Sequence, residues 1–468
     1  MPVRSEAKTV PEKTPVNPLR RLAPGQALIL YYIVAILSGS VLLRLPIASA
    51  GSSLKYIDAL FTAASAQCVT GLTVVETGSA LSLFGQAVVL VLIQLGGLGI
   101  TTFSVYLFFF LHQGVGTRGR WIISETLLHT PVSSMGALVG GIILVALLME
   151  AVGAVLLSIV FVPEFGFGKG IFASVFHSVS AFCNAGFSLF PDSLMRYSSS
   201  LLVNLTVIWL IITGGIGFLV IREVNDILFR RYAGRKPRLS LHSRIVLWTS
   251  AALILGGGLS IWLLERTGSL AGMTSGGGIL AALFQSVTAR TAGFNTLDVS
   301  TFQVSTLLFL IFLMFVGASP GSAGGGIKTT SLALFVAILR SRLKGNPHTN
   351  LFKRTIPEEI VTKVLALVML AIFLILSALF VLLLVQHPDA SSGQPEGVFL
   401  QYLFETVSAF GTVGLTMGAT AKLTFSGKLI IIMLMVIGRV GLLTVAFTFV
   451  KRLSSTAPRY AEENIMIG

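Results

Sequence analysis

The chain alternates between long apolar stretches and short polar connections. A helix needs roughly 20 apolar residues to cross the hydrocarbon core of a bilayer, and eight stretches come close to or exceed that length. They cover residues 27–45, 83–112, 134–162, 200–229, 243–264, 303–340, 361–386 and 426–450, the sixth with an interruption. The pattern predicts an all-α polytopic membrane protein with eight full spans.

A shorter apolar segment, each time followed by a glycine-centred stretch, lies between the two spans of every pair. The clearest example is FETVSAFGTVGLT at residues 404–416, and related stretches begin at Phe61, Phe176 and Phe284. About a dozen apolar residues cannot cross a bilayer. A half-length helix followed by an extended strand is typical of a re-entrant pore loop, whose backbone carbonyls replace the water shell of a cation. Irregular backbone at that depth has to line a polar cavity or be buried in protein.

The four central glycines divide the chain into near-equal units. They are Gly71, Gly186, Gly293 and Gly414, at intervals of 115, 107 and 121 residues. The flanking Phe, Ser/Thr and Ala residues recur in register, which is typical of an internal repeat. We therefore expect four pseudo-symmetric span–loop–span repeats around one central pore. The expected boundaries are a basic tail at 1–26, repeats at 27–112, 134–231, 243–340 and 359–452, and a second tail at 453–468.

Composition and charge support a membrane location. The chain is 54% hydrophobic and 11% charged, with a formal charge of +14, which is far from the average soluble domain. Of the 33 Lys and Arg residues, 23 lie on the side that holds both ends of the chain. The positive-inside rule predicts that both termini are cytoplasmic. We expect these cations to contact lipid headgroups, and we expect no nucleic-acid partner.

The sixth stretch contains GASPGSAGGGIKTT at residues 317–330. Glycine and proline interrupt the hydrogen bonds of a helix, so we expect a flexible intramembrane loop that acts as a gate. A phosphate-binding loop is the competing interpretation, but Ile327 separates Gly326 from Lys328 and the flanks are membrane-like. The candidate gate residues in the loop are Gly317, Pro320, Gly321, Gly324, Gly325, Gly326 and Lys328.

The second span of three repeats contains a glycine cluster, at 96–99, 214–217 and 438–441. Close packing between helices is one explanation of these glycines. The last cluster includes Arg439, whose charge within a span costs at least ~2.5 kcal/mol unless it faces water or a partner. We expect Arg439 to face the pore below the loops, as a further gate residue.

No arrangement of residues typical of an enzyme is present. The six histidines are scattered, and Cys68 and Cys183 hold matching positions three residues before Gly71 and Gly186. We expect no cofactor bound by the chain itself. An ion-coupled symporter would need inverted repeats around a midplane site, whereas these four repeats share one topology.

Together, the four repeats, the central glycines, GASPGSAGGGIK and the GRVGLLT segment around Arg439 resemble the Trk/Ktr/HKT superfamily of potassium transporters. The resemblance extends over residues 27–451, and the single span before the first pore loop places it closest to the membrane subunits of Ktr systems. It implies potassium uptake across the cell (inner) membrane by a homodimer, with Na⁺ as an activator. It also implies a cytosolic nucleotide-binding RCK subunit (KtrA-like) that binds ATP or ADP and controls the gate. A sodium-permeable or ion-coupled member of the same superfamily remains the alternative.

The resemblance also implies which residues form the potassium filter. Members with serine in place of the first glycine tend to pass sodium, so Gly71 favours potassium. The four strands differ in sequence, and we therefore expect a less regular ring of carbonyls than in a tetrameric channel. The implied filter residues are Val69, Thr70, Gly71, Asn184, Ala185, Gly186, Thr291, Ala292, Gly293, Thr412, Val413 and Gly414.

Overall fold

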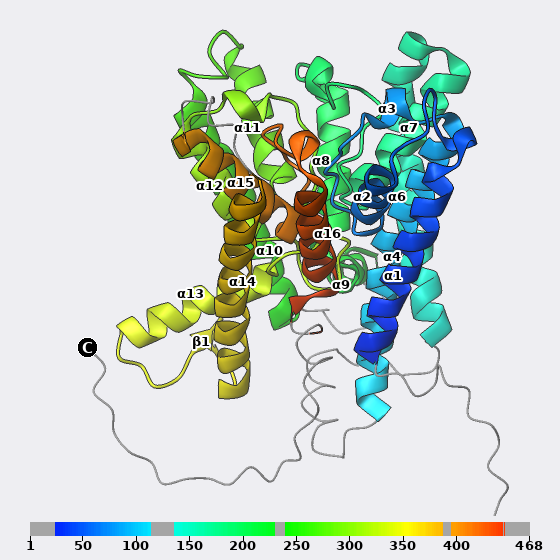
Figure 1. Ribbon diagram of the computed structural model, residues 1–468. Helices are drawn as coiled ribbons and strands as arrows, with labels where there is room; N and C mark the ends of the chain where they lie inside the picture. Colours follow the sequence, from blue (N-terminus) through cyan, green and yellow to red (C-terminus); the bar gives the residue numbers. More distant parts are fainter. Residues whose placement is uncertain (1–23, 114–134, 230–238, 387–394, 443, 445–468) are drawn as a thin grey trace, which may run out of the picture.

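A computed structural model describes residues 24–113, 135–229, 239–386, 395–442 and 444 (Figure 1). Helices form almost all of the regular structure in this part of the chain. The longer helices are α1 (Pro24–Arg44), α2 (Tyr56–Gln67), α4 (Leu83–Gln113), α6 (Met135–Phe165), α7 (Phe167–Phe182), α8 (Leu201–Ile216), α9 (Phe218–Phe229), α10 (Leu241–Glu265), α11 (Ser275–Thr288), α12 (Val304–Phe315), α13 (Thr329–Leu343), α14 (Glu358–Val385), α15 (Pro395–Gly411) and α16 (Phe425–Val440). The shorter elements are α3 (Thr77–Ala80), η2 (Pro46–Ala48), η3 (Met195–Tyr197), η4 (Val299–Thr301), η5 (Thr420–Lys422), β1 (Asn350–Leu351) and β2 (Arg354–Thr355).

Four of the described helices are long and apolar enough to cross a membrane. They are the first helices of the four predicted repeats: 25–44 in α1, 139–165 in α6, 241–265 in α10 and 358–385 in α14. A third or less of the most apolar window of each is buried inside the protein. Such a helix exposes most of its apolar surface, which is stable only where lipid covers it.

The predicted span over residues 200–229 is not one continuous helix, and on this point the sequence-based prediction is wrong. Helix α8 ends at Ile216, α9 begins at Phe218, and the two meet at an angle of 103°. Gly217 between them has φ 96°, a conformation that glycine adopts without steric cost. A Cβ atom at Gly217 would lie 2.5 Å from the carbonyl oxygen of Pro320, so a segment from another repeat occupies the bend.

The predicted interruption of the sixth stretch is present. Helix α12 ends at Phe315 and α13 begins at Thr329, with non-helical backbone between them. We keep the predicted name, intramembrane loop, for residues 317–328, since Thr329 and Thr330 of the predicted 317–330 segment belong to α13. Beyond it, α13 extends sideways from the body beside a short antiparallel hairpin of β1 and β2, which the all-α prediction omits (Figure 1). Of the eighth predicted span, residues 443 and 445–450 lie outside the described residues.

The short helices α2, α7, α11 and α15 pack in a cyclic order. Each contacts the long helix that precedes it in its own repeat. The helix that follows in one repeat contacts the short helix of the next: α4 with α7, α8 with α11, α12 with α15, and finally α16 with α2. The phenylalanine that opens each repeated motif is fully buried in this packing: Phe61, Phe176, Phe284 and Phe404 are all 0% exposed.

An ion pair links the first and last repeats. Lys428 Nζ in α16 lies 2.6 Å from Asp58 Oδ1 in the first turn of α2, and the two side chains are only 13% and 15% exposed. The carboxylate also lies at a helix N-terminus, where the helix dipole favours a negative charge. This pair stabilises the contact between α16 and α2 that closes the cyclic order.

We predict that Asp58→Asn lowers the stability of the detergent-solubilised protein. The change leaves the Lys428 ammonium without its partner, and a buried donor that loses its partner costs about 1–3 kcal/mol. Thermal unfolding measures the effect, and the double variant Asp58→Asn, Lys428→Met should recover part of the loss. Glu359→Gln removes an exposed ion pair with Lys363 and serves as the control with no expected change. An Asp58→Asn variant as stable as the wild type would contradict this interpretation.

Candidate functional site

Each short helix is followed by a strand with two residues of positive φ, separated by one residue. We call residues 69–71, 184–186, 291–293 and 412–414 the ring strands. Three of their first residues are β-branched, and a β-branched residue at positive φ is a strained outlier that costs of order 1–3 kcal/mol. The φ values are 55° and 93° for Val69 and Gly71, 59° and 68° for Asn184 and Gly186, 71° and 78° for Thr291 and Gly293, and 50° and 93° for Thr412 and Gly414. The same pair of positive φ values in all four repeats indicates a shared functional geometry.

The four glycines form a closed ring. A Cβ atom built on any of them would collide with the carbonyl oxygen of the residue before the glycine of the next repeat. These contacts are Gly71 with Ala185 (2.5 Å), Gly186 with Ala292 (2.8 Å), Gly293 with Val413 (2.5 Å) and Gly414 with Thr70. The last contact returns to the first repeat, so the twelve residues of the sequence-predicted filter come together around one centre.

A hydroxyl group at the same position of each short helix anchors the strand that follows. Ser65 and Ser408 accept hydrogen bonds from the backbone N–H of Gly71 and Gly414, each at 3.1 Å. In the other two repeats the hydroxyl donates instead to the carbonyl just beyond the glycine: Ser180 to Phe187 and Thr288 to Phe294, each at 2.8 Å. These anchors were not identified as functional from the sequence, although the recurring Ser/Thr was the available signal.

Two further side chains tether the segments just beyond the second and fourth ring strands. Glu405 in α15 is fully buried and accepts hydrogen bonds from Thr416 Oγ1, Thr420 Oγ1 (2.5 Å) and the Met417 N–H (3.2 Å). His177 in α7 holds the matching position and its Nε2 is 2.9 Å from Ser188 Oγ. Each tether joins a short helix to a residue 11 positions later in its own repeat, so it limits the movement of the strand between them.

The glycine clusters of the second helices permit close packing behind the ring strands. A Cβ atom at Gly96, Gly214 or Gly438 would overlap a backbone carbonyl oxygen at the end of a short helix. The carbonyls are those of Gln67, Phe182 and Phe410, each two residues before the first residue of positive φ. The packing explanation of the clusters is therefore sufficient for these three glycines.

The intramembrane loop lies directly against the ring strands. The Gly325 N–H donates to Thr412 Oγ1 at 3.0 Å, and a Cβ atom at Gly324 would overlap Thr291 Oγ1. The loop also reaches the backbone where α8 ends: the Ser319 N–H donates to the Gly215 carbonyl at 3.0 Å and the Ala323 N–H to that of Gly214 at 3.1 Å. The predicted gate residues of the loop thus adjoin ring strands of the third and fourth repeats.

Arg439 is 2% exposed, and its guanidinium group is held by neutral groups from other elements. It donates to the Ala323 carbonyl in the intramembrane loop, to the Gly96 carbonyl in α4 at 2.6 Å, and to Tyr32 Oη in α1 at 3.2 Å. Arg439 therefore links the loop of the third repeat to the first and fourth repeats. Tyr32 was not singled out from the sequence.

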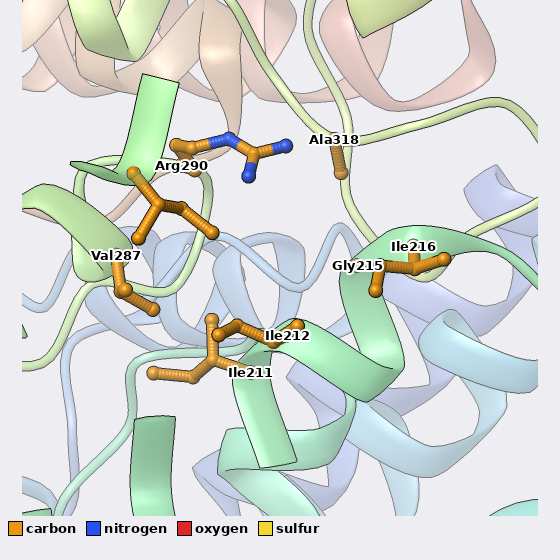
Figure 2. A pocket seen from close by; sticks show the side chains of 8 residues that line it. Ile211, Ile212, Gly215, Ile216, Val287, Arg290 and Ala318 are labelled. Atoms are coloured by element: carbon orange, nitrogen blue, oxygen red, sulfur yellow. The ribbon is translucent and has the colours of Figure 1, made fainter. Parts of the chain in front are cut away.

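Two other cations lie near the loop. Lys328 Nζ donates to the Gly324 carbonyl at 2.7 Å, inside the loop itself. Arg290, next to the third ring strand, donates to Ser250 Oγ at 3.1 Å. Figure 2 shows the Arg290 side chain extending toward Ala318 of the loop, above a small apolar pocket that Ile211, Ile212, Gly215 and Val287 help to line.

The site holds no constellation typical of catalysis. Within the described residues, no three His, Cys, Asp or Glu side chains are grouped as a metal site. What the elements bring together is backbone carbonyls and small side chains at the centre of an apolar helical body. A helical membrane body with such a ring is typical of a multi-pass membrane transporter.

Comparison with known proteins gives the family. Residues 6–458 match the family described as TrkH, cation transport protein, and the chain belongs to this family. It is 41% identical to the Ktr system potassium uptake protein B of Bacillus subtilis, over 96% of this chain and 97% of that one. It is 39% identical to the potassium/sodium uptake protein NtpJ of Enterococcus hirae, over 96% and 98%. The crystal structure of the potassium transporter TrkH from Vibrio parahaemolyticus shares the fold, with a TM-score of 0.72 at 18% identity, over 94% of this chain and 86% of that one.

We predict that Gly438→Ala destabilises the protein because the added methyl group would overlap the Phe410 carbonyl. Overpacking of this kind costs about 1–3 kcal/mol, and it should displace the fourth ring strand. Gly256→Ala in α10 is the matched control, since no atom outside its own stretch of helix backbone lies within 4 Å of its Cβ position. Thermal unfolding compares the two variants, and equal stability would contradict the packing role of Gly438.

Proposed function

We propose that the chain takes up potassium ions across the cell membrane through the ring strands, which act as the selectivity filter. The observation that carries this proposal is the closed ring, in which four strained glycine-centred strands meet at one centre. Backbone carbonyls arranged in such a ring can replace the hydration shell of an alkali cation. The names of the relatives support potassium as the ion.

The helices around the ring favour a cation. Helices α2, α7, α11 and α15 end directly before the ring strands. The carboxyl end of a helix carries partial negative charge, so four such ends near one centre lower the energy of a dehydrated cation there. A pore also needs ions to leave easily, and the Arg439 charge would limit how long they remain.

The intramembrane loop is the proposed gate. It contacts Thr412 on one side and the broken end of α8 on the other. Ion passage then requires the loop to move, which breaks its hydrogen bonds to Gly214, Gly215 and Arg439. Because glycine imposes few restrictions on φ and ψ, the loop can change conformation at low cost.

The remaining architecture follows from the family resemblance and the charge pattern. Eight spans are proposed, with α8–α9 and α12–α13 as broken spans, both termini in the cytoplasm and the four repeats around a single pore. Transport by a homodimer, activation by Na⁺, and gating by a cytosolic RCK-type subunit that binds ATP or ADP are part of the same proposal. The relatives named as parts of a Ktr system support the existence of a partner subunit.

A sodium-permeable or ion-coupled transporter is the second candidate. The Enterococcus relative is named a potassium/sodium uptake protein, and this favours a broader ion range. The two candidates differ in the ratio of K⁺ to Na⁺ uptake at equal driving force and in whether one ion requires the other.

The test is tracer uptake into proteoliposomes containing the purified chain, with and without an added RCK subunit. We expect ⁸⁶Rb⁺ uptake, and we expect K⁺ to inhibit this uptake much more strongly than Na⁺ does. Nucleotide should change the rate of uptake only when the RCK subunit is present. Uptake of neutral solutes, or no cation uptake under either condition, would refute the proposal. Equal competition by Na⁺ would support the second candidate.

We predict that Gly71→Ser weakens the preference for K⁺ over Na⁺. A Cβ atom at Gly71 would lie 2.5 Å from the Ala185 carbonyl oxygen, and serine is strained at φ 93°. The ring must therefore deform, and a loss of about 1–3 kcal/mol in selectivity corresponds to a roughly 5- to 150-fold change. Competition of Na⁺ against ⁸⁶Rb⁺ uptake measures it. Unchanged selectivity would count against the filter assignment.

We also predict that Arg439→Ala raises the maximal ion flux. The change removes the hydrogen bond to the Ala323 carbonyl of the loop, and the closed position of the loop thereby loses the contribution of one charged hydrogen bond, about 1.5–3 kcal/mol. Arg44→Ala at the outer end of α1 is the control. Flux and K⁺ affinity equal to the wild type would remove the proposed role of Arg439.

A further inference from the structure

A buried carboxylate lies behind the second ring strand, in the middle of α6. Glu150 is 5% exposed, and both of its oxygens accept hydrogen bonds from Gln94 Nε2 of α4, each at 3.1 Å. The Cys183 thiol donates to Glu150 Oε1 at 3.8 Å. Among the described residues these partners are an amide and a thiol, not a cation. An ionisable residue inside a span is costly and is by default a functional candidate.

The thiol connects this carboxylate to the ring. Cys183 immediately precedes Asn184, the first residue of the second ring strand, which has φ 59°. The Cys183 Sγ is also 3.7 Å from Gln94 Oε1, and a Cβ atom at Gly97 would lie 2.6 Å from it. The side chain of Cys183 is therefore held between Glu150 of its own repeat and Gln94 of the first repeat.

The sister repeats show that packing does not require a carboxylate here. Gly153 of α6 and Gly257 of α10 each pack against a serine hydroxyl of the following short helix, Ser178 and Ser286. Those serines donate to the carbonyls of Glu150 (2.6 Å) and Ile254 (2.9 Å), each three residues before the glycine. In the first repeat Gly39 of α1, which packs against Ala63 and Leu92, takes the place of these glycines. Ile36, three residues before it, therefore corresponds to Glu150. The second repeat thus has glutamate where the first and third have isoleucine.

We propose that Glu150 is a positioning residue for the second ring strand. Glu150 and Gln94 together hold the Cys183 side chain in place. Because Cys183 is bonded directly to Asn184, this also fixes the backbone of Asn184, Ala185 and Gly186. The inference rests on the proposed ion conduction and concerns the selectivity of that same site. The hydrogen bonds of Glu150, and not its charge, position the strand. A neutral side chain of the same shape therefore serves in place of the carboxylate.

The test compares Glu150→Ile, the residue of the first and third repeats, with Glu150→Gln, which keeps the hydrogen-bonding shape. Both variants are assayed for ⁸⁶Rb⁺ uptake in proteoliposomes with Na⁺ and K⁺ as competitors. For Ile we expect the K⁺ preference over Na⁺ to fall about fivefold, and for Gln to stay within about twofold of the wild type, as for coupled neighbours of a binding site. Glu164→Gln is the matched control, since it makes the same chemical change on α6 at an exposed residue.

If the Ile variant does not accumulate, Gln94→Leu interrupts the same link from α4 and is expected to give the same fall in preference. Wild-type selectivity in either of these disconnecting variants would overturn the inference. So would an equal loss in the Gln variant, because the charge and not the hydrogen bonds would then be decisive. A wild-type protein that carries no potassium refutes the proposed function itself, whereas a selective wild type with unaffected variants refutes only the role of Glu150.

Discussion

The structure depends on close contact between glycine backbone and carbonyl oxygen at two levels. In the ring, each glycine lies against a carbonyl of the next repeat; behind it, Gly96, Gly214 and Gly438 lie against carbonyls that end the short helices. Any side chain at these positions would separate the backbones. The strain at Val69, Thr291 and Thr412 is tolerated because the surrounding packing leaves no alternative. Hydroxyl anchors and the Glu405 tether then hold the strands at that distance.

The repeats and their glycine-centred strands could be predicted from the sequence because both are encoded locally. Period, length and apolar pattern suffice to find four short helices and the breaks that follow them. The interruption between α12 and α13 was also predictable, since glycine and proline act on the helix in which they stand. The contacts between these elements could not be predicted from the sequence. The internal repeat suggested only that they surround a common axis.

The bend between α8 and α9 was not predictable for a physical reason. GGIG at 214–217 resembles GGLG at 96–99, yet the latter remains inside the continuous helix α4. The difference lies in the third repeat, because the intramembrane loop inserts Pro320 and Gly321 at the bend and replaces lost helical hydrogen bonds with its own. The partners of Arg439 and Glu405 were missed for the same reason. Each belongs to a segment distant in sequence or to a turn whose shape only the folded structure defines.

The single chain also explains why the repeats are allowed to differ. In a fourfold oligomer every charged side chain near the axis would occur four times, and each would need its own compensation in a medium where unpaired charge is costly. Here Arg439 occurs once and uses carbonyls from the first and third repeats, while Glu405 uses the turn of its own repeat. Because Arg439 and Glu405 each occur only once, a single repeat can carry the loop. Covalent linkage of the four repeats therefore permits a distinct loop on one side of a ring that remains nearly symmetric.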